Sequence, residues 1–283
     1  MGRILWQIRF PRLIAAVLAG SALSVSGVLI QTALANALAG PSIIGINAGA
    51  GLAVVLCMVC LAKSVFILPL AAFCGAFLAM LFVYGIACAV GLSRMTLVLS
   101  GVALSSLMNA GISTLTTIHP EIMGNLRDFQ NGGFMGISMK QLLPATGLIV
   151  FALVLTWIFA GELDILSLGK DTASSLGLPV EVYRFLFLAL ASILTGAVVS
   201  FAGLISFVGL IIPHMSRLLL QGGTKRALLA LSALLGANFL LLCDTVARTL
   251  FTPFELPVGI LISYVGVPFF LWLLFGARRK RYD

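Results

Sequence analysis

The stretch SFAGLISFVGLIIPHMSRLLL, residues 200–220, decides the fold class of this chain. It is apolar almost throughout, but Gly203, Gly209 and Pro213 interrupt it, and it closes with a His-x-x-Arg pattern. In a water-soluble core helix these interruptions would expose backbone groups, whereas in a membrane bundle neighbouring helices or a water-lined cavity satisfy them. The stretch therefore indicates a membrane-embedded helical region with irregular backbone.

The composition of the whole chain agrees with that interpretation. Of 283 residues, 61% are hydrophobic and only 9% are charged, against roughly 25% charged in soluble domains. The net charge is +8, but the basic residues stand mainly between apolar runs or at their ends, so they require no nucleic-acid partner. We therefore expect an all-α polytopic membrane protein with one transmembrane domain, residues 1–283.

Because a membrane span needs about 20 apolar residues, the apolar runs predict nine transmembrane helices. They cover residues 13–34, 43–62, 66–90, 95–118, 142–161, 184–203, 204–220, 227–247 and 257–276.

The basic residues predict the orientation of these spans. Residues 278–281 are Arg-Arg-Lys-Arg and belong in the cytoplasm, as do Lys225 and Arg226. Nine spans then put the N-terminus outside, although the positive-inside rule disfavours Arg9 and Arg12 there.

Short motifs in the apolar runs have plain structural interpretations. Cys57 and Cys60 form a C-x-x-C spacing without a second pair, so we expect small hydrophobic side chains and no metal or redox site. Gly45 and Gly49 form a G-x-x-x-G spacing, which allows close helix packing. No G-x-x-x-x-G-K-[ST] pattern is present, so the chain is not expected to hydrolyse ATP itself.

The connection at residues 161–183 is predicted to contain a short helix over residues 169–176. Gly177 is placed to end that helix in a left-handed cap, and Pro179 prevents its continuation. An ordinary surface loop has no need of a capped helix, so this segment is a candidate functional element.

Two further groups of residues have both a structural and a functional interpretation. Asp244 stands inside a predicted span with Arg248 one turn later, which predicts an intramembrane ion pair. Gly209, Pro213 and His214 form a block whose expected role is helix geometry, with a proton relay through His214 as the alternative.

The blocks at residues 200–220 and 256–274 (LPVGILISYVGVPFFLWLL), together with the L-x-L-G-x-x-x-A-x-x-L-G block that begins at Leu166, resemble FecCD-type permeases. These are membrane subunits of ATP-binding-cassette (ABC) importers for iron-siderophores, haem and cobalamin. The resemblance implies a type II ABC importer permease-like bundle in the cell membrane of a prokaryote. The family usually has ten helices, so we expect that this chain begins after the first one, through a truncated or misassigned start in preference to a natural nine-helix variant.

The resemblance also implies roles for individual residues. It places ATPase coupling, within residues 162–183, at Leu168, Gly169, Ala173, Leu176, Gly177 and Leu178. It places docking of the binding protein at Arg9, Arg12 and Arg248. It makes the hydroxyl-rich fourth span a wall of the translocation path, with Ser105, Asn109, Ser113 and Thr116, although Ser and Thr side chains in a span also bond to their own backbone. The chain departs from the family pattern at Asn36-Ala37, where Asn-Pro is common, and at Asn131-Gly132-Gly133-Phe134, which lacks a preceding Trp.

The implied partners are a second permease protomer, identical or paralogous, two ABC ATPase subunits that bind ATP and Mg, an external substrate-binding protein, and membrane lipid. The chain itself is expected to bind no cofactor and no metal. We thus expect a permease that imports a metal chelate by alternating access, without covalent chemistry. An ion-coupled secondary transporter is the alternative, but only Asp244 and His214 could serve as its intramembrane ionisable groups. A membrane enzyme is disfavoured because no nucleophile and base, or cluster of His and carboxylate residues, is recognisable.

Overall fold

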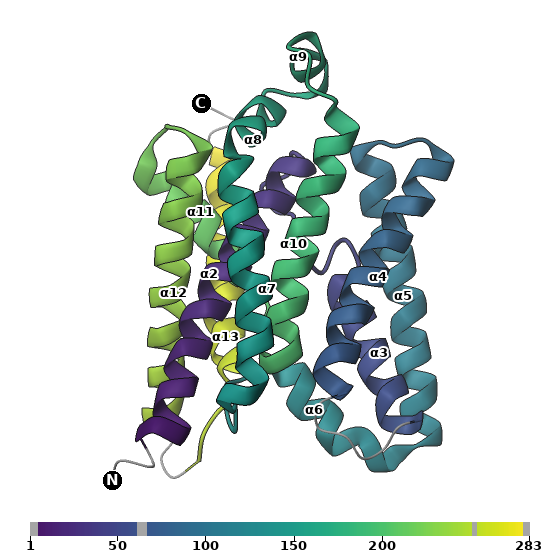
Figure 1. Ribbon diagram of the computed structural model, residues 1–283, viewed down its shortest axis with the longest axis vertical. Helices are drawn as coiled ribbons and strands as arrows, with labels where there is room; N and C mark the ends of the chain where they lie inside the picture. Colours follow the sequence, from purple (N-terminus) through teal and green to yellow (C-terminus); the bar gives the residue numbers. More distant parts are fainter. Residues whose placement is uncertain (1–4, 61–66, 251–253, 280–283) are drawn as a thin grey trace.

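The helical structure is seen in a computed structural model, which describes residues 5–60, 67–250 and 254–279 (Figure 1). Within these ranges the regular structure is helical and no strand is formed. The elements in chain order are η1 (Leu5–Arg9), α2 (Phe10–Ala33), α3 (Ile46–Cys60), α4 (Ile67–Val90), α5 (Arg94–Ile118), η2 (Pro120–Ile122), α6 (Met123–Asn131), α7 (Met139–Ile158), α8 (Ala160–Ser167), α9 (Lys170–Ser175), α10 (Val180–Ala202), α11 (Val208–Leu220), α12 (Lys225–Thr249) and α13 (Val258–Arg279).

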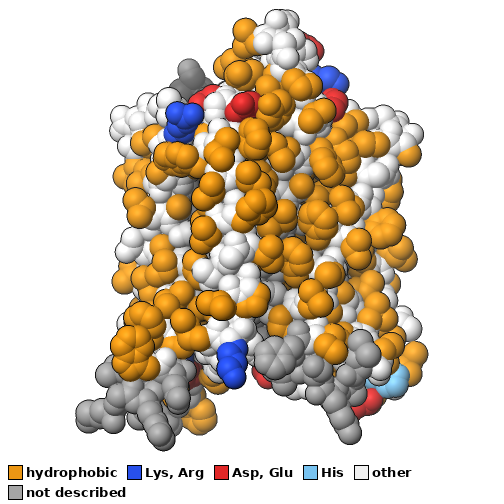
Figure 2. Space-filling view, viewed as in Figure 1, with side chains coloured by type: hydrophobic (Ala, Val, Ile, Leu, Met, Phe, Trp, Pro, Cys, Tyr) orange, Lys and Arg blue, Asp and Glu red, His pale blue; other side chains and the backbone are white. Residues whose placement is uncertain are grey.

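Six of these helices, α2, α4, α5, α7, α10 and α12, are long and apolar enough to cross a membrane. Three shorter apolar helices, α3, α11 and the 258–269 part of α13, complete the set within the described residues. Each of the nine falls on one predicted span, and the predicted all-α membrane bundle is confirmed. On the face in Figure 2, hydrophobic side chains cover the middle and charged side chains gather toward the two ends.

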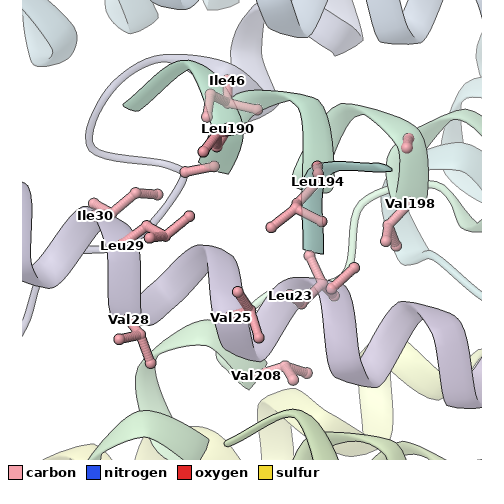
Figure 3. Packing of buried hydrophobic residues seen from close by; sticks show 14 of the residues in the cluster. Leu23, Val25, Val28, Leu29, Ile30, Ile46, Leu190, Leu194, Val198 and Val208 are labelled. Carbon is pink, nitrogen blue, oxygen red and sulfur yellow. The ribbon is translucent and has the colours of Figure 1, made fainter. Parts of the chain in front are cut away.

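Helix α2 is the centre of the bundle. It packs against α7, α10, α11 and α12, and Figure 3 shows Leu23 and Leu29 of α2 beside Leu190 and Leu194 of α10. These four side chains are at most 2% exposed. Lipid is as apolar as leucine, so close van der Waals packing between helices is what stabilises such a core in a membrane.

Helices α3, α4 and α5 form a second group, packed on one another. Helix α10 joins the two groups, because it contacts both α2 and α4. The described chain begins and ends at opposite ends of the bundle (Figure 1), in agreement with an odd number of crossings. The end that carries α9 is the predicted cytoplasmic end, and the end that carries α6 is the predicted external end.

Irregular backbone separates some of the helices inside the bundle. Helix α3 begins at Ile46, later than the predicted residue 43, and α11 begins at Val208, later than the predicted 204. In the connection before α3, Ala39 and Ile44 are at most 1% exposed. Non-helical backbone at this depth is stable only where protein surrounds it, as it does here.

Two α-helices in the described residues were not predicted from the sequence. Helix α6 lies in the connection between the predicted spans 95–118 and 142–161, and α8 follows α7 after a break at Phe159. Both are short, with nine and eight residues, and neither forms a long apolar run. Apolar length alone therefore does not reveal them.

Candidate functional site

The short helix α9 stands at the tip of the predicted cytoplasmic end (Figure 1). It covers Lys170–Ser175, one residue less at each end than predicted. Gly177 has φ +82°, its N–H donates to the Ser174 carbonyl at 2.9 Å, and the Leu178 N–H donates to the Ala173 carbonyl at 3.0 Å. These two bonds are a Schellman motif, in which the glycine takes the left-handed conformation, so the predicted cap is confirmed.

The predicted coupling residues divide into buried and exposed positions. Ala173 is fully buried and Leu178 is 9% exposed, and both belong to the main hydrophobic cluster. Leu168 and Leu176 are 58% and 61% exposed. The buried pair anchors α9 to the bundle, while two leucines at an aqueous end present an apolar surface that a partner could cover.

An ion network ties α9 to the first turn of α10. Lys170 Nζ lies 3.0 Å from Glu181 Oε1, and Arg184 Nη1 donates to Glu181 Oε2 at 2.7 Å. The Arg184 side chain is only 2% exposed. The Tyr84 hydroxyl of α4 donates to the Glu181 carbonyl at 3.1 Å, so three elements meet at Glu181.

On the other side of this end, α8 contacts α12. Asp164 Oδ1 accepts from the backbone N–H of Lys225 at 2.9 Å, at the first residue of α12. The N-terminal turn of a helix has free N–H groups, and a carboxylate is stabilising there. The predicted cytoplasmic segment is thus fixed to two separate spans, α10 and α12.

Pro213 supplies a physical reason for the predicted helix-geometry motif. A proline inside a helix has no N–H and leaves the carbonyl four residues earlier without its helical donor; in α11 that carbonyl belongs to Gly209. Gln31 of α2 donates its Nε2 to this carbonyl at 3.1 Å, and its Oε1 accepts from Arg217 Nη2 at 2.6 Å. His214 stands beside this bridge, with its ring edge-on to Phe269 at 6.1 Å.

Asp244, for which the sequence predicts an ion pair with Arg248, has a partner on another helix. Asp244 accepts three hydrogen bonds from Arg12 of α2, at 2.9 to 3.1 Å. The pair is nearly dry, with the Arg12 and Asp244 side chains 11% and 5% exposed. The packing of α2 against α12 brings Arg12 to the carboxylate, and the pair between Asp244 and Arg248 stays a prediction.

Glu255 completes this external charge cluster, which we define as Arg12, Asp244 and Glu255. Arg12 Nη1 lies 2.7 Å from Glu255 Oε2. Of the three predicted docking arginines, Arg9 is exposed, Arg248 is half-buried and Arg12 is engaged with two carboxylates inside its own chain. A cavity of about 500 Å³ opens beside Arg12 and Glu255, lined also by residues 132–136 and 199–203.

The predicted path residues form one stripe along α5, but they do not share one environment. Asn109 and Ser113 are exposed, Ser105 is half-buried and Thr116 is 9% exposed. The Thr116 hydroxyl donates to the carbonyls of Ile112 and Ser113 in its own helix. The structure thus leaves a polar exposed face at Asn109 and Ser113, and turns Thr116 inward.

No metal site is found among the residues that the structure describes, because no three His, Cys, Asp or Glu side chains gather there. Cys57 is a buried free thiol and Cys60 an exposed one. Sequence reasoning gave no role to Gln31, Glu181 or Glu255. Gln31 was detectable as a polar residue in an apolar run, whereas the partners of the two glutamates lie in other elements.

This architecture and its sequence match those of known membrane transport proteins. The model of the FecCD transport family matches residues 2–276. The chain is 38% identical over 276 residues to the Fe(3+) dicitrate transport system permease protein FecD of Escherichia coli (strain K12), covering 97% of this chain and 86% of the relative. It is 38% identical over 272 residues to the cobalamin import system permease protein BtuC of Halobacterium salinarum, covering 96% and 73%.

Two solved structures have a similar fold. A metal-chelate type ABC transporter in an inward-facing conformation superposes with a TM-score of 0.90 at 30% identity, covering 97% of this chain and 88% of that one. PsaBC from Streptococcus pneumoniae shares the fold, with a TM-score of 0.69 at 22% identity over 92% of this chain and 88% of that one. These matches, over nearly the whole helical bundle, show that the chain belongs to the FecCD transport family.

Proposed function

We propose that this chain is the transmembrane permease subunit of a binding-protein-dependent ABC importer in the plasma membrane of a prokaryote. The observation that carries the proposal is α9, a capped helix at the cytoplasmic tip with Leu168 and Leu176 exposed and Ala173 anchored in the bundle. A surface helix without a partner gains nothing from two exposed leucines. A separate ATPase that binds ATP and Mg supplies the energy, and its movement reaches the bundle through α9.

The cargo is proposed to be an intact metal chelate, such as an iron(III) complex or cobalamin. The named relatives carry iron dicitrate and cobalamin, two bulky metal complexes of different shape. The exposed polar face of α5, at Asn109 and Ser113, is the proposed wall of the path. A second permease protomer faces it and completes the pathway, since one chain leaves this face uncovered.

The external charge cluster disfavours the ion-coupled alternative. A coupling carboxylate must exchange its ion in each cycle, whereas Asp244 accepts three hydrogen bonds from Arg12 and is 5% exposed. A buried pair of this kind is costly to break. For docking of the external binding protein, Arg9 and Arg248 are the proposed contacts, and Arg12 is assigned to the cluster instead.

The test is co-purification of the tagged chain with the ABC ATPase of its own transport system, in mild detergent. We expect Leu176→Asp to lower ATPase recovery at least about tenfold, because a charge in the centre of an apolar contact leaves it unpaired. Gln221→Asp is the matched control, since it adds the same charge at an exposed position of the same end and should leave recovery unchanged.

Undiminished recovery with Leu176→Asp would exclude α9 as the ATPase contact. In the same preparation, Arg9→Glu should weaken binding of the external binding protein without changing ATPase recovery. Equal binding by Arg9→Glu and the unchanged chain would remove Arg9 from the docking surface.

A further inference from the structure

Three helix ends meet at the external end of the bundle, and we call their meeting point the glycine junction. It consists of Phe129 to Gly133 at the end of α6, Ala202 to Leu204 at the end of α10, and Gly259 in the first turn of α13. Three backbone hydrogen bonds close it. Leu204 N–H donates to the Phe129 carbonyl at 2.9 Å, Gly133 N–H to the Ala202 carbonyl at 2.8 Å, and Gly259 N–H to the Gly132 carbonyl at 3.2 Å.

Glycine is needed in this junction for steric reasons. A Cβ at Gly132 would overlap the Leu204 carbonyl, one at Gly203 the Phe129 carbonyl, and one at Gly259 the Asn131 carbonyl. Gly132 and Gly203 also have φ of +62° and +69°, which side chains rarely adopt. The junction therefore holds three backbones at a distance that no side chain permits, and it accounts for the Asn131-Gly132-Gly133-Phe134 sequence to which the proposed function gives no role.

Helix α10 runs from this junction to the coupling segment without a break. Its 23 residues make a rod about 34 Å long at 1.5 Å per residue. At the cytoplasmic end, Glu181 pairs with Lys170 of α9 and with the buried Arg184. At the external end, Leu204 bonds to Phe129 of α6 and Ala202 to Gly133 just after α6, in both cases through main-chain atoms.

We propose that α10 carries displacement of the coupling helix α9 to α6, with Glu181 and the glycine junction as the positioning elements at its two ends. The inference rests on the proposed function of α9. Main-chain hydrogen bonds at the glycine junction cannot be relieved by a change of side-chain rotamer. When α10 is displaced, α6 is therefore displaced with it. Helix α6 continues from α5 through η2, and the external end of the proposed path wall moves with it.

A double-mutant cycle tests the linkage in the permease–ATPase complex reconstituted in lipid. We expect Glu181→Gln to lower substrate transported per ATP about threefold and Gly259→Ala about tenfold, with Glu181→Asp restoring coupling. The free-energy effects of mutations at sites this far apart normally add, so two independent losses of coupling would multiply to about thirtyfold in the double variant. If both residues act through one shared linkage, the double variant should lose coupling only about tenfold. A loss of about thirtyfold would overturn the proposal.

The control is Gly124→Ala, which places the same methyl group on α6 where no atom lies within 4 Å. It should keep wild-type coupling, and a loss equal to that of Gly259→Ala would also overturn the proposal. A thermal unfolding scan of each variant separates loss of folded protein from loss of coupling.

A second measurement avoids the glycine variants. A fluorescent label at Gln130→Cys, an exposed position on α6, is read before and after a non-hydrolysable ATP analogue, with exposed Cys60, Cys74 and Cys88 replaced by serine. We expect a spectral shift that Glu181→Gln reduces by more than half. A full shift in Glu181→Gln with ATPase bound would overturn the linkage alone, whereas failure of the ATPase to co-purify would remove the proposed function and this inference with it.

Discussion

Helix α2 has 24 residues and helix α5 has 25, and both are long and apolar enough to span a membrane. Their surroundings differ sharply. In the most apolar 18-residue segment of each helix, 72% of the residues are buried in α2 and only 11% are buried in α5. Helix α2 is buried by protein over most of its length, whereas α5 is in contact with α3 and α4 on one side and open on the other. Apolar composition thus identifies a span but does not say whether lipid, protein or a transport path lies beside it.

This difference predicts that α2 tolerates changes in volume far less than α5 does. The largest effect is expected for Gly27→Val in α2, because a Cβ at Gly27 would overlap the backbone of Gly209 in α11. Overpacking against backbone cannot relax by a change of rotamer, so we expect a loss of at least about 3 kcal/mol in the free energy of unfolding. Thermal unfolding and the yield of monodisperse protein in detergent measure it.

The matched variant is Gly111→Val in α5. There the nearest atom to an added Cβ is Leu52 Cδ1 at 3.2 Å, the end of a flexible side chain, so the cost should stay within about 1 kcal/mol. Equal destabilisation of the two variants would mean that burial does not separate the two helices in the membrane.

Each of the two helices has one amide side chain, Gln31 in α2 and Asn109 in α5, and substituting them tests the same difference in burial. Gln31→Met in α2 removes both the donor to the Gly209 carbonyl and the acceptor of Arg217. Leaving these buried groups unsatisfied should cost about 1–3 kcal/mol of stability, seen as a lower unfolding temperature.

Asn109→Met in α5 is the counterpart, because Asn109 is exposed. Its effect on stability should lie within about 0.5 kcal/mol, while uptake of a labelled chelate by the assembled importer should fall severalfold. If Asn109→Met destabilised the chain as much as Gln31→Met, Asn109 would be a packing residue and not part of the path wall.

The same contrast explains which features could be predicted from the sequence. The apolar runs give the nine apolar helices, and local chemistry gives the α9 cap, because the Gly177 turn depends only on neighbouring residues. The ion pair of Asp244 could not be predicted, since its partner Arg12 is 232 residues away and only the packing of α2 on α12 brings them together. Local spacing points only to Arg248, four residues later on the same helix.

The irregular segments were predictable only in part. Gly203, Gly209 and Pro213 show that the helix breaks between residues 200 and 220, but not what satisfies the freed groups. That role falls to Gln31 and to the backbone of the α6 connection, which lie far away in the sequence. Similarly, the hydroxyls of α5 are visible in the sequence, yet their direction around the helix relative to α3 and α4 depends on tertiary packing.

The smallest expected effect separates two hydroxyls that the sequence treats as equivalent, Thr116 and Ser113 of α5. The Thr116 hydroxyl is 9% exposed and donates to carbonyls of its own helix at 2.9 and 3.0 Å. Valine has nearly the same shape, and those carbonyls keep their helical donors, so Thr116→Val should change stability by less than about 0.5 kcal/mol and leave uptake unchanged.

Ser113→Ala removes an exposed hydroxyl from the proposed path wall and should lower the initial rate of uptake about twofold, as expected for one modest hydrogen bond to a passing polar surface. Initial uptake rates in proteoliposomes, at matched amounts of assembled importer, distinguish the two variants. A loss of uptake with Thr116→Val and none with Ser113→Ala would require α5 to rotate about its axis during transport, because the face now turned toward α3 and α4 would then be the one that meets the cargo.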